Sequence, residues 1–358
     1  MTNRHAVLPL RRLWLAGALL LTLGACAEPS TPPPGSGSGP TPPGPLAWKT
    51  AAPAPISQYE AAGASIDGRL YVFGGFYTLL NNKPLVTVRT SVYNSASGRW
   101  NQLADMPEAV THAATVAVGS KVYLAGGFIG DHPGPETDHV WIYDTATNRW
   151  SAGPSLPAPR GAGALALVGR KLHFFGGTRR DATELHDYTQ DFGTHWVLDL
   201  DGSGDWTEAA PLPTPRNHLS GIALDGLIYA IGGQHLGDEV AGDLPDVQVY
   251  DPATDRWSAR KNLPLPLGHT MASTVVWNGH IVVAGGVTLA ENPAPDDVEG
   301  KESNTVLDYD PKTDKWTRLT DLPAPRQSPV AGVLGTKLVV TGGATDDGPT
   351  DVTWIGTR

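Results

Sequence analysis

Short apolar segments, separated by glycine, proline and charged residues, make up most of the chain. Six of them end in a pair of glycines, and they read LYVFGG, VYLAGG, LHFFGG, IYAIGG, IVVAGG and LVVTGG. Each run is too short for a helix and is rich in β-branched and aromatic residues, so it predicts a buried β-strand. The glycine pairs begin 50 to 57 residues apart, at Gly74, Gly126, Gly176, Gly232, Gly285 and Gly342. A period of this length indicates one structural unit repeated six times.

A tyrosine and a tryptophan, seven residues apart, follow most of the glycine pairs. They are Tyr93 and Trp100, Tyr143 and Trp150, Tyr250 and Trp257, and Tyr309 and Trp316. The third repeat keeps Trp206 but has Leu200 in place of the tyrosine. Between them lie segments such as DPATDRW, whose aspartate accepts hydrogen bonds from turn amides and whose proline fixes its backbone angle. Each repeat therefore predicts four strands, the innermost being a segment such as Leu219–Asp225.

The composition favours an all-β fold. Glycine (42 residues) and proline (32 residues) leave little room for long helices, and 11 tryptophans argue against disorder. The formal net charge is -10, and Lys and Arg form no basic run. Binding to nucleic acid needs clustered cations to neutralise phosphates, so we expect no nucleic-acid partner.

The N-terminus predicts a lipoprotein signal peptide, residues 1–25. Arg11 and Arg12 precede the apolar stretch Leu13–Leu23, which is too short to span a membrane but suits the core of a secretory leader. The stretch ends in LGAC, which resembles the lipobox of bacterial lipoproteins. The resemblance implies that Cys26 is lipidated and becomes the first mature residue. We therefore expect an exported protein of the cell envelope, anchored to a membrane by lipid.

Residues 26–46 are expected to form the lipidated cysteine and a tether, because they are rich in Pro, Gly and Ser and have nothing to bury. The globular domain is expected over residues 47–358. Cys26 is the only cysteine. The globular domain is therefore predicted to contain no disulfide, thiolate metal site or cysteine nucleophile.

The repeated Gly-Gly, Tyr and Trp pattern resembles the kelch repeat, in six copies over residues 48–358. The resemblance implies an all-β, six-bladed β-propeller whose blades are four-stranded antiparallel sheets. The Trp and Tyr side chains are then expected to pack between neighbouring blades. The last repeat ends after its third strand, Val352–Gly356, and the segment around Trp48 looks like a fourth strand without a blade. We therefore expect the N-terminal strand to close the last blade.

Loops of uneven length are expected on one face of the propeller. In antiparallel four-stranded blades, the links between strands two and three share a face with the links from one blade to the next. The long insertions all fall between strands two and three, at Phe76–Arg89, Thr178–Thr194, Gln234–Asp246 and Val287–Asn304. Because such loops can vary without disturbing the scaffold, we predict the binding site on this face.

Residues at the rim of the central channel are indexed by counting back from the glycine pairs. Fourteen positions back lie Glu60, His112, Ala162, His218, Met271 and Ser328. Sixteen positions back lie Gln58, Val110, Arg160, Arg216, His269 and Arg326. The predicted ligand-binding residues are Glu60, His112, Arg160, Arg216, Asn217, His218, His235, His269 and Arg326. We expect the glutamate and the axial histidines to point toward one axis with the arginines around them; alternatively, the arginines brace adjacent blades and the histidines bind loop carbonyls.

This set of groups suits a small anionic or polyhydroxy ligand, because planar guanidinium groups match carboxylate geometry. Neutral imidazoles from separate strands also bind Zn, Cu or Ni, but no local histidine spacing supports a metal. No cofactor is predicted. In the third-repeat insertion, Glu184, Asp187 and Asp191 are weak candidates for holding a hard cation. More commonly, such a run is a solvated loop that pairs its own charges.

The predicted function is binding of a glycan, a small anionic ligand or a peptide by a monomeric, membrane-tethered propeller outside the cytoplasm. The alternative is a sugar isomerase similar to sialic acid mutarotases, in which Glu60 with His112 or His218 supplies acid-base catalysis. A copper oxidase similar to galactose oxidase is excluded, because that family needs a Tyr-Cys crosslink. We expect Arg216→Ala or His218→Ala to abolish ligand binding without lowering the melting temperature.

Overall fold

The computed structural model describes residues 45–358, apart from 81–82, 132–133, 181–188, 237–241 and 289–299. The regular secondary structure of these residues consists of β-strands, as the composition predicts. No helix in this part of the chain is long and apolar enough to cross a membrane. The predicted leader and most of the predicted tether lie outside the described residues.

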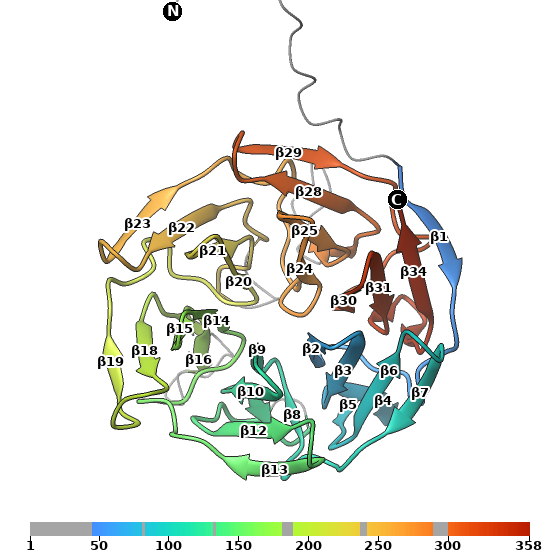
Figure 1. Cartoon of the computed structure of the whole chain (residues 1–358), viewed down its shortest axis with the longest axis horizontal. Coiled ribbons are helices and arrows are strands. Elements are labelled where there is room, and N and C mark those ends of the chain that lie inside the picture. Colours follow the sequence, from blue (N-terminus) through green and yellow to red (C-terminus); the bar gives the residue numbers. More distant parts are fainter. Residues whose placement is uncertain (1–44, 81–82, 132–133, 181–188, 237–241, 289–299) are drawn as a thin grey trace, which may run out of the picture. The chain divides into compact units, whose positions relative to one another are not determined.

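Six four-stranded antiparallel sheets follow one another around a ring, which confirms the predicted six-bladed propeller (Figure 1). In the first five blades the strands run in chain order from the axis outward. Blade one contains β2 (Ala62–Ile66), β3 (Arg69–Phe73), β6 (Thr90–Asn94) and β7 (Arg99–Gln102). Blade two contains β9 (Ala114–Val118), β10 (Lys121–Ala125), β12 (Val140–Asp144) and β13 (Arg149–Ala152). Blade three contains β14 (Ala164–Val168), β15 (Lys171–Phe175), β18 (His195–Asp199) and β19 (Trp206–Glu208).

The next two blades repeat this order. Blade four contains β20 (Ser220–Leu224), β21 (Leu227–Ile231), β22 (Val247–Asp251) and β23 (Arg256–Ala259). Blade five contains β24 (Thr274–Trp277), β25 (His280–Ala284), β28 (Val306–Asp310) and β29 (Lys315–Arg318).

Blade six combines the two ends of the described chain. Its three inner strands are β30 (Val330–Leu334), β31 (Lys337–Thr341) and β34 (Thr353–Thr357), and its outermost strand is β1 (Ala47–Thr50). Strand β1 runs antiparallel to β34, with Trp48 opposite Gly356. A Cβ at position 356 would come within 2.9 Å of the Trp48 ring. The glycine therefore provides the space that this indole occupies.

Tight turns join the strands on the face opposite the long loops. The turn Asp225-Gly226 joins the first two strands of blade four, and both residues have positive φ, as a two-residue type I′ hairpin needs. Between the third and fourth strands of blade two, Asp144 Oδ1 accepts hydrogen bonds from the amides of Ala146 and Thr147, at 2.9 and 3.1 Å. Such side-chain caps keep these turns short.

Neighbouring blades pack through apolar side chains and a repeated tryptophan contact. Between blades three and four, for example, Phe175, Ile228 and Tyr250 belong to one buried cluster. The tryptophan near the start of each outermost strand donates its indole N–H to a carbonyl in the link from the preceding blade, as Trp316 does to Lys261 at 2.8 Å. The six equivalent residues are Trp48, Trp100, Trp150, Trp206, Trp257 and Trp316. The predicted packing role of these tryptophans is confirmed.

The links between strands two and three lie on the same face as the links between blades, and we call this the loop face. Here short strands pair as small two-stranded sheets. These sheets are β4 (Phe76–Leu80) with β5 (Lys83–Val86), β8 (Val110–Thr111) with β11 (Phe128–Ile129), β16 (Thr178–Arg180) with β17 (Thr189–Asp191), β26 (Val287–Thr288) with β27 (Lys301–Glu302), and β32 (Ala344–Thr345) with β33 (Gly348–Pro349).

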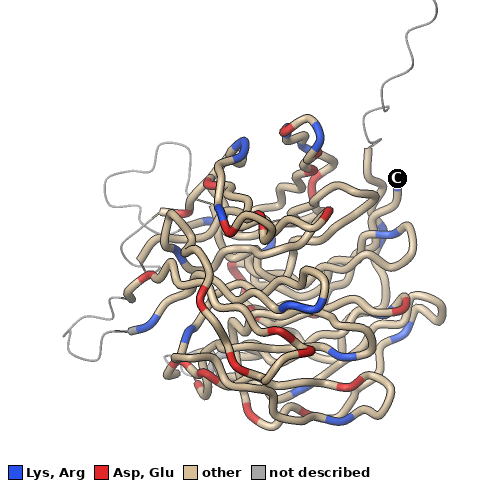
Figure 2. The backbone as a smooth tube through the Cα atoms, turned by 60° about the vertical axis from the view of Figure 1, so that its left-hand side comes forward, with Lys and Arg blue, Asp and Glu red and all other residues tan. Residues whose placement is uncertain are grey.

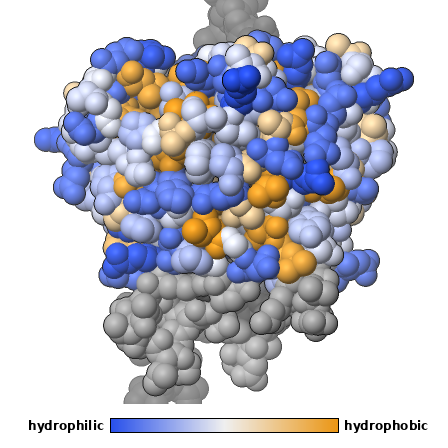
Figure 3. All heavy atoms as spheres, turned by 90° about the horizontal axis from the view of Figure 1, so that it is seen from below, coloured by the Kyte–Doolittle hydropathy of each residue, from blue (hydrophilic) through white to orange (hydrophobic). Residues whose placement is uncertain are grey.

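The described surface is mixed in charge and polarity. Basic and acidic positions are interspersed along the backbone (Figure 2). The flank of the ring seen in Figure 3 is largely hydrophilic, with small separate hydrophobic patches. Among the described residues, Tyr77 in β4 is the exposed large hydrophobic side chain, at 38% exposure. It lies on the loop face, where an aromatic ring is available for contact with a ligand.

Candidate functional site

One residue in each blade adopts a left-handed backbone conformation just before the innermost strand, at the loop-face end of the axis. These residues are Glu60, His112, Ala162, His218, His269 and Ser328, with φ between 46° and 56°. We call them the axial ring. The residue before Glu60, Tyr59, exchanges both backbone hydrogen bonds with Phe76, at 2.9 and 2.8 Å. Because this bridge fixes the preceding residue, the chain enters β2 through a positive φ at Glu60.

Backbone hydrogen bonds also join members of the axial ring in neighbouring blades, around the axis of the propeller. The His112 amide donates to the Glu60 carbonyl at 3.1 Å, and the His218 amide donates to the Ala162 carbonyl at 2.9 Å. Each of these bonds links one blade to the next. The scaffold therefore fixes the positions of the axial side chains before any ligand is bound.

The structure corrects the indexing of the fifth repeat. Equal spacing placed Met271 at the axial position, but His269 has the left-handed conformation there. Blade five has two more residues than blade four between its axial residue and its glycine pair, and they form a turn before β24 begins at Thr274. Met271 instead lines the central hollow.

Glu60 is the centre of the cluster. Its side chain is 2% exposed. His269 Nδ1 donates to Glu60 Oε1 at 2.7 Å, and the Ser328 hydroxyl donates to the same oxygen. The other carboxylate oxygen, Oε2, lies 3.3 Å from His112 Nε2. The sequence index placed Ser328 in this ring but gave no reason to include it among the site residues, whereas the structure shows its hydroxyl bound to the carboxylate.

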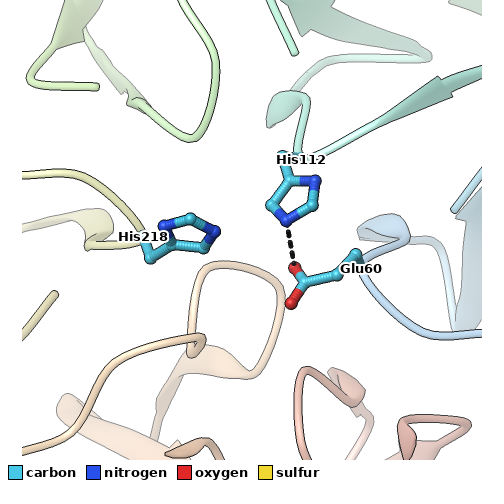
Figure 4. Close-up of side chains that lie close together, drawn as sticks. All are labelled: Glu60, His112 and His218. Carbon is cyan, nitrogen blue, oxygen red and sulfur yellow. Dashed lines mark ion pairs between the residues drawn. The ribbon is translucent and has the colours of Figure 1, made fainter. Parts of the chain in front are cut away.

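His218 completes the cluster from blade four, and Figure 4 shows His112, His218 and Glu60 converging from three blades. The His218 ring centre lies 4.9 Å from that of His112 and 4.2 Å from that of His269. One carboxylate and three imidazoles therefore meet at the axis, as the sequence predicts.

The pKa of the Glu60 carboxyl reflects two opposing effects. Burial alone raises it, but the neighbouring imidazoles of His112, His269 and His218 outweigh burial, so the pKa of Glu60 lies well below its ordinary value. Glu60 is therefore ionised at neutral pH. A buried carboxylate in this state needs cationic partners or hydrogen-bond donors around it.

The arginines predicted to surround the axis are held mainly by groups of their own blades. Arg216 is fully buried, and its guanidinium donates to the carbonyls of Gly232 (2.6 Å), Ala230 (3.1 Å) and Thr214 (2.9 Å) and to Gln248 Oε1 (2.8 Å). Gly232, Ala230 and Gln248 lie in or beside the second and third strands of its own blade, and Thr214 lies in the link that leads into it. Burial lowers the pKa of Arg216 to about 10, which still leaves it charged at neutral pH. Arg216 therefore braces its own blade, whereas the alternative expectation was that the arginines brace adjacent blades.

Arg160 and Arg326 occupy the equivalent positions in blades three and six, and both are 4% exposed. The Arg160 guanidinium lies 3.6 Å from the Phe192 ring centre and 5.0 Å from that of Trp196. The Arg326 guanidinium lies 4.3 Å from the ring centre of Trp354. Such cation-π contacts hold each arginine against the third-strand region of its own blade. We call Arg160, Arg216 and Arg326 the arginine brace.

Two further predicted residues, Asn217 and His235, lie on either side of Asp191. Asn217 Nδ2 donates to Asp191 and to the Leu236 carbonyl, and His235 Nδ1 lies 2.8 Å from Asp191 Oδ2. Burial raises the pKa of Asp191 despite the hydrogen bonds that it accepts from the Leu236 amide and Asn217. Asp191 therefore links the loops of blades three and four. The other weak metal candidates, Glu184 and Asp187, lie outside the described residues.

A hollow of about 20 Å³ lies among the inner strands next to the axial ring. Its lining includes Ala113 and Leu219, which directly follow His112 and His218, together with the small residues Gly63, Gly163 and Gly221. A space of this size holds about one water molecule.

Fold and site together define a six-bladed propeller with a buried polar centre at the loop-face end of its axis. Residues 45–233 and 111–343 match the model of the KLHDC2/KLHL20/DRC7 Kelch-repeats domain. The chain therefore belongs to the kelch-repeat family, in agreement with the pattern of its glycine pairs, tyrosines and tryptophans.

The chain is similar to several characterised kelch proteins. It is 30% identical to Kelch-like protein terF of Aspergillus terreus over 280 residues, which cover 73% of this chain and 59% of the relative. It is 33% identical over 152 residues to Beta-scruin of Limulus polyphemus, covering 42% of this chain and 16% of the scruin. It is also 33% identical over 142 residues to the Kelch repeat and BTB domain-containing protein 1 of cowpox virus, covering 40% of this chain and 23% of the relative. The chain thus spans less than two thirds of each relative.

Proposed function

We propose that the protein is a binding propeller that recognises a glycan or a peptide on its loop face. The observation that carries this proposal is the division of the two faces: the long insertions and the axial ring share the loop face, while the opposite face has tight turns. A rigid scaffold that presents variable loops on one side is the usual arrangement for recognition in such folds. The kelch relatives support the same scaffold role.

The ligand class follows from the groups that remain available on this face. Arg216 donates only to groups beside or within its own blade, and Arg160 and Arg326 lie buried against aromatic rings of theirs, so recognition of an anion by guanidinium has less support there. Tyr77 and His235 are the exposed candidates, with His235 54% exposed and held beside Asp191. An aromatic ring and an imidazole, each with a polar atom and a flat face, suit a glycan or a peptide.

We further propose that the protein works as a monomer, anchored to a membrane of the cell envelope through lipidated Cys26. The support is the leader and the LGAC motif in the sequence. Mass spectrometry of the exported protein tests the anchor, since a diacylated Cys26 supports it and an intact N-terminal leader refutes it. Light scattering of the same sample tests the monomer.

We also infer that β1 closes the ring. Its pairing with β34 covers the edge of blade six that would otherwise be open, and open strand edges promote aggregation. The proposal predicts that replacing Trp48 by glycine loosens blade six and raises aggregation on heating.

A screen of immobilised glycans and peptides with the full-length chain, solubilised in detergent, tests the binding proposal. We expect at least one hit whose affinity falls about tenfold or more in Tyr77→Ala or His235→Ala. Lys171→Ala is the matched control, because Lys171 is exposed (57%) and begins β15 next to a turn on the opposite face. Hits that weaken equally in all three variants, or no hits at all, contradict the loop-face site.

Sugar isomerisation is the second candidate, and the 2.7 Å hydrogen bond between His269 and Glu60 favours it. A carboxylate and an imidazole within hydrogen-bond reach are the groups that ring opening needs. The adjoining hollow of about 20 Å³ is smaller than a sugar, so we rank this activity below binding. Anomeric exchange of sialic acid, followed by NMR with wild type and Glu60→Gln, separates the two: acceleration by wild type alone supports the isomerase.

A further inference from the structure

We propose that Glu60, His112 and His218 form a binding site for a divalent transition-metal ion, for which Zn2+ is the test ion. Each residue offers one ligand atom, and these atoms all lie within 4.8 Å of one another. They come from blades one, two and four and point toward a common point (Figure 4). The site lies at the axis and goes beyond the loop-face binding proposed above.

The carboxylate of Glu60 is arranged as a metal ligand. Its Oε1 accepts from His269 and Ser328, whereas the buried Oε2 accepts no hydrogen bond from the described residues. A buried carboxylate oxygen without a donor is costly unless something else neutralises it. A cation at Oε2 supplies that neutralisation.

The distance between Oε2 and His112 Nε2 is 3.3 Å. A charged hydrogen bond between these groups is shorter, about 2.7 to 2.9 Å. In a tetrahedral zinc site, bonds of about 2.0 to 2.1 Å separate neighbouring ligand atoms by about 3.3 Å. The spacing of the two side chains is therefore that of two ligands to one ion.

The tautomer of the neutral His218 ring is fixed by its neighbour. Asn217 Nδ2 donates to Asp191 and to the Leu236 carbonyl, so the amide oxygen of Asn217 must face His218 Nδ1. An amide oxygen only accepts, so Nδ1 carries the proton of the neutral ring. Nε2 then carries the lone pair of the ring, and a hydrogen bond of this kind at the other ring nitrogen orients histidine ligands in metal sites.

Two imidazole nitrogens and one carboxylate oxygen are the donor set that Zn2+ and other first-row transition ions prefer over Mg2+ or Ca2+. Zinc sites with three protein ligands keep a fourth position for water. The fixed backbone of the axial ring holds the three ligands on separate blades, so binding an ion requires no refolding.

Titration calorimetry with ZnCl2 on the untagged full-length chain in detergent, after removal of metals, tests the site. We expect one ion per chain in wild type, and an affinity lowered by about 100-fold or more in Glu60→Gln, His112→Asn and His218→Asn. Asparagine tolerates the left-handed backbone of these positions, and glutamine preserves the shape of Glu60. His139→Asn is the matched control, because His139 pairs with Glu108 at 2.8 Å but is 47% exposed and lies outside the cluster.

The possible results of the zinc titration lead to different conclusions. Loss of zinc binding in the three axial variants but not in His139→Asn, with melting temperatures close to wild type, supports the site. Wild type that binds no zinc at micromolar concentration, or zinc binding that survives all three substitutions, overturns it. Every variant retains the N-terminal segment with Cys26. Any zinc bound there is therefore the same in all variants, and differences in zinc affinity between variants come from the substituted residues.

Asn217 provides a second test, as a positioning residue. Asn217→Leu removes the acceptor that holds His218 Nδ1–H while leaving all three ligands in place. We expect about 10-fold weaker zinc binding with an unchanged 1:1 stoichiometry. Unchanged affinity in this variant contradicts the assignment of His218 Nε2 as the ligand atom.

Discussion

The axial ring and the arginine brace lie two residues apart on the same segments, yet they meet opposite surroundings. In blade four, Arg216 directs its guanidinium onto three carbonyls and an amide oxygen of its own blade. His218, two residues later, faces side chains from other blades across the axis. Both are buried and polar. The difference is that the fold satisfies the arginine completely, whereas it leaves an oxygen of Glu60 without a donor.

This contrast gives a physical criterion for separating structural from functional polar groups. A buried charge whose partners are backbone groups of its own blade stabilises that blade, because its removal leaves those groups unpaired. Polar groups that converge from several blades and retain unused acceptors are available for a ligand or an ion. Residue type alone does not distinguish them.

The largest expected effect separates the two sets directly. Arg216→Met should lower the free energy of unfolding by about 3 to 5 kcal/mol, because three carbonyls and Gln248 lose their donor in a dry interior. His218→Asn should cost only about 1 kcal/mol, since asparagine tolerates its positive φ. Urea denaturation measures both. Equal losses would show that the axial ring is as structural as the brace.

This prediction reverses the expectation from the sequence, in which Arg216→Ala leaves the melting temperature unchanged. Arg326→Met is a useful companion, because Arg326 rests on one cation-π contact and a single carbonyl. It should destabilise less than Arg216→Met.

A second pair of buried histidines gives an effect of intermediate size that depends on pH. His173 Nδ1 lies 3.0 Å from His195 Nε2, and both rings are 2% exposed between blades three and four. Burial, with the neighbouring His195 and Lys171, lowers the pKa of His173 to about 3, and burial lowers that of His195 to about 4. The unfolded chain takes up protons near pH 6.5 that the folded chain excludes. Stability should therefore be constant above about pH 6.5 and fall as the pH drops toward 4.

The double variant His173→Val with His195→Val tests this, because valine occupies both equivalent strand positions in blade five, at Val282 and Val306. We expect the loss of stability between pH 6.5 and pH 4 to be smaller than in wild type. If the double variant shows the same pH profile as wild type, the loss of stability comes from other groups. His173 and His195 would then not differ from the axial histidines in their effect on stability.

The smallest expected effect concerns the contacts between blades. Trp316→Phe removes the indole hydrogen bond to Lys261, at 2.8 Å, but keeps most of the ring packing. We expect a loss of about 1 kcal/mol in thermal unfolding. Trp100→Phe removes the equivalent bond to Ala52, at 3.0 Å, and should cost the same within about 0.5 kcal/mol. A large difference between them would mean that the blades do not share one bracing scheme.

The fifth repeat shows where prediction from the sequence failed. Counting back from Gly285 assumes segments of equal length, but two extra residues before Thr274 place the axial histidine two positions earlier than the count, at His269 instead of Met271. In the other five repeats the count gave the axial residue. The error matters because His269, which donates to Glu60, was grouped with the arginines instead of with the axial residues.

The sequence by itself determined the number of repeats, the four strands in each, the face that carries the long loops and the residue types near the axis. These follow from local patterns, since glycine pairs, turn residues and apolar runs act within one repeat. The tertiary structure decided which side chains meet. Glu60 and Ser328 are 268 positions apart in the chain and touch only because the ring closes, and the direction of Arg216 depends on carbonyls that only the folded blade brings together.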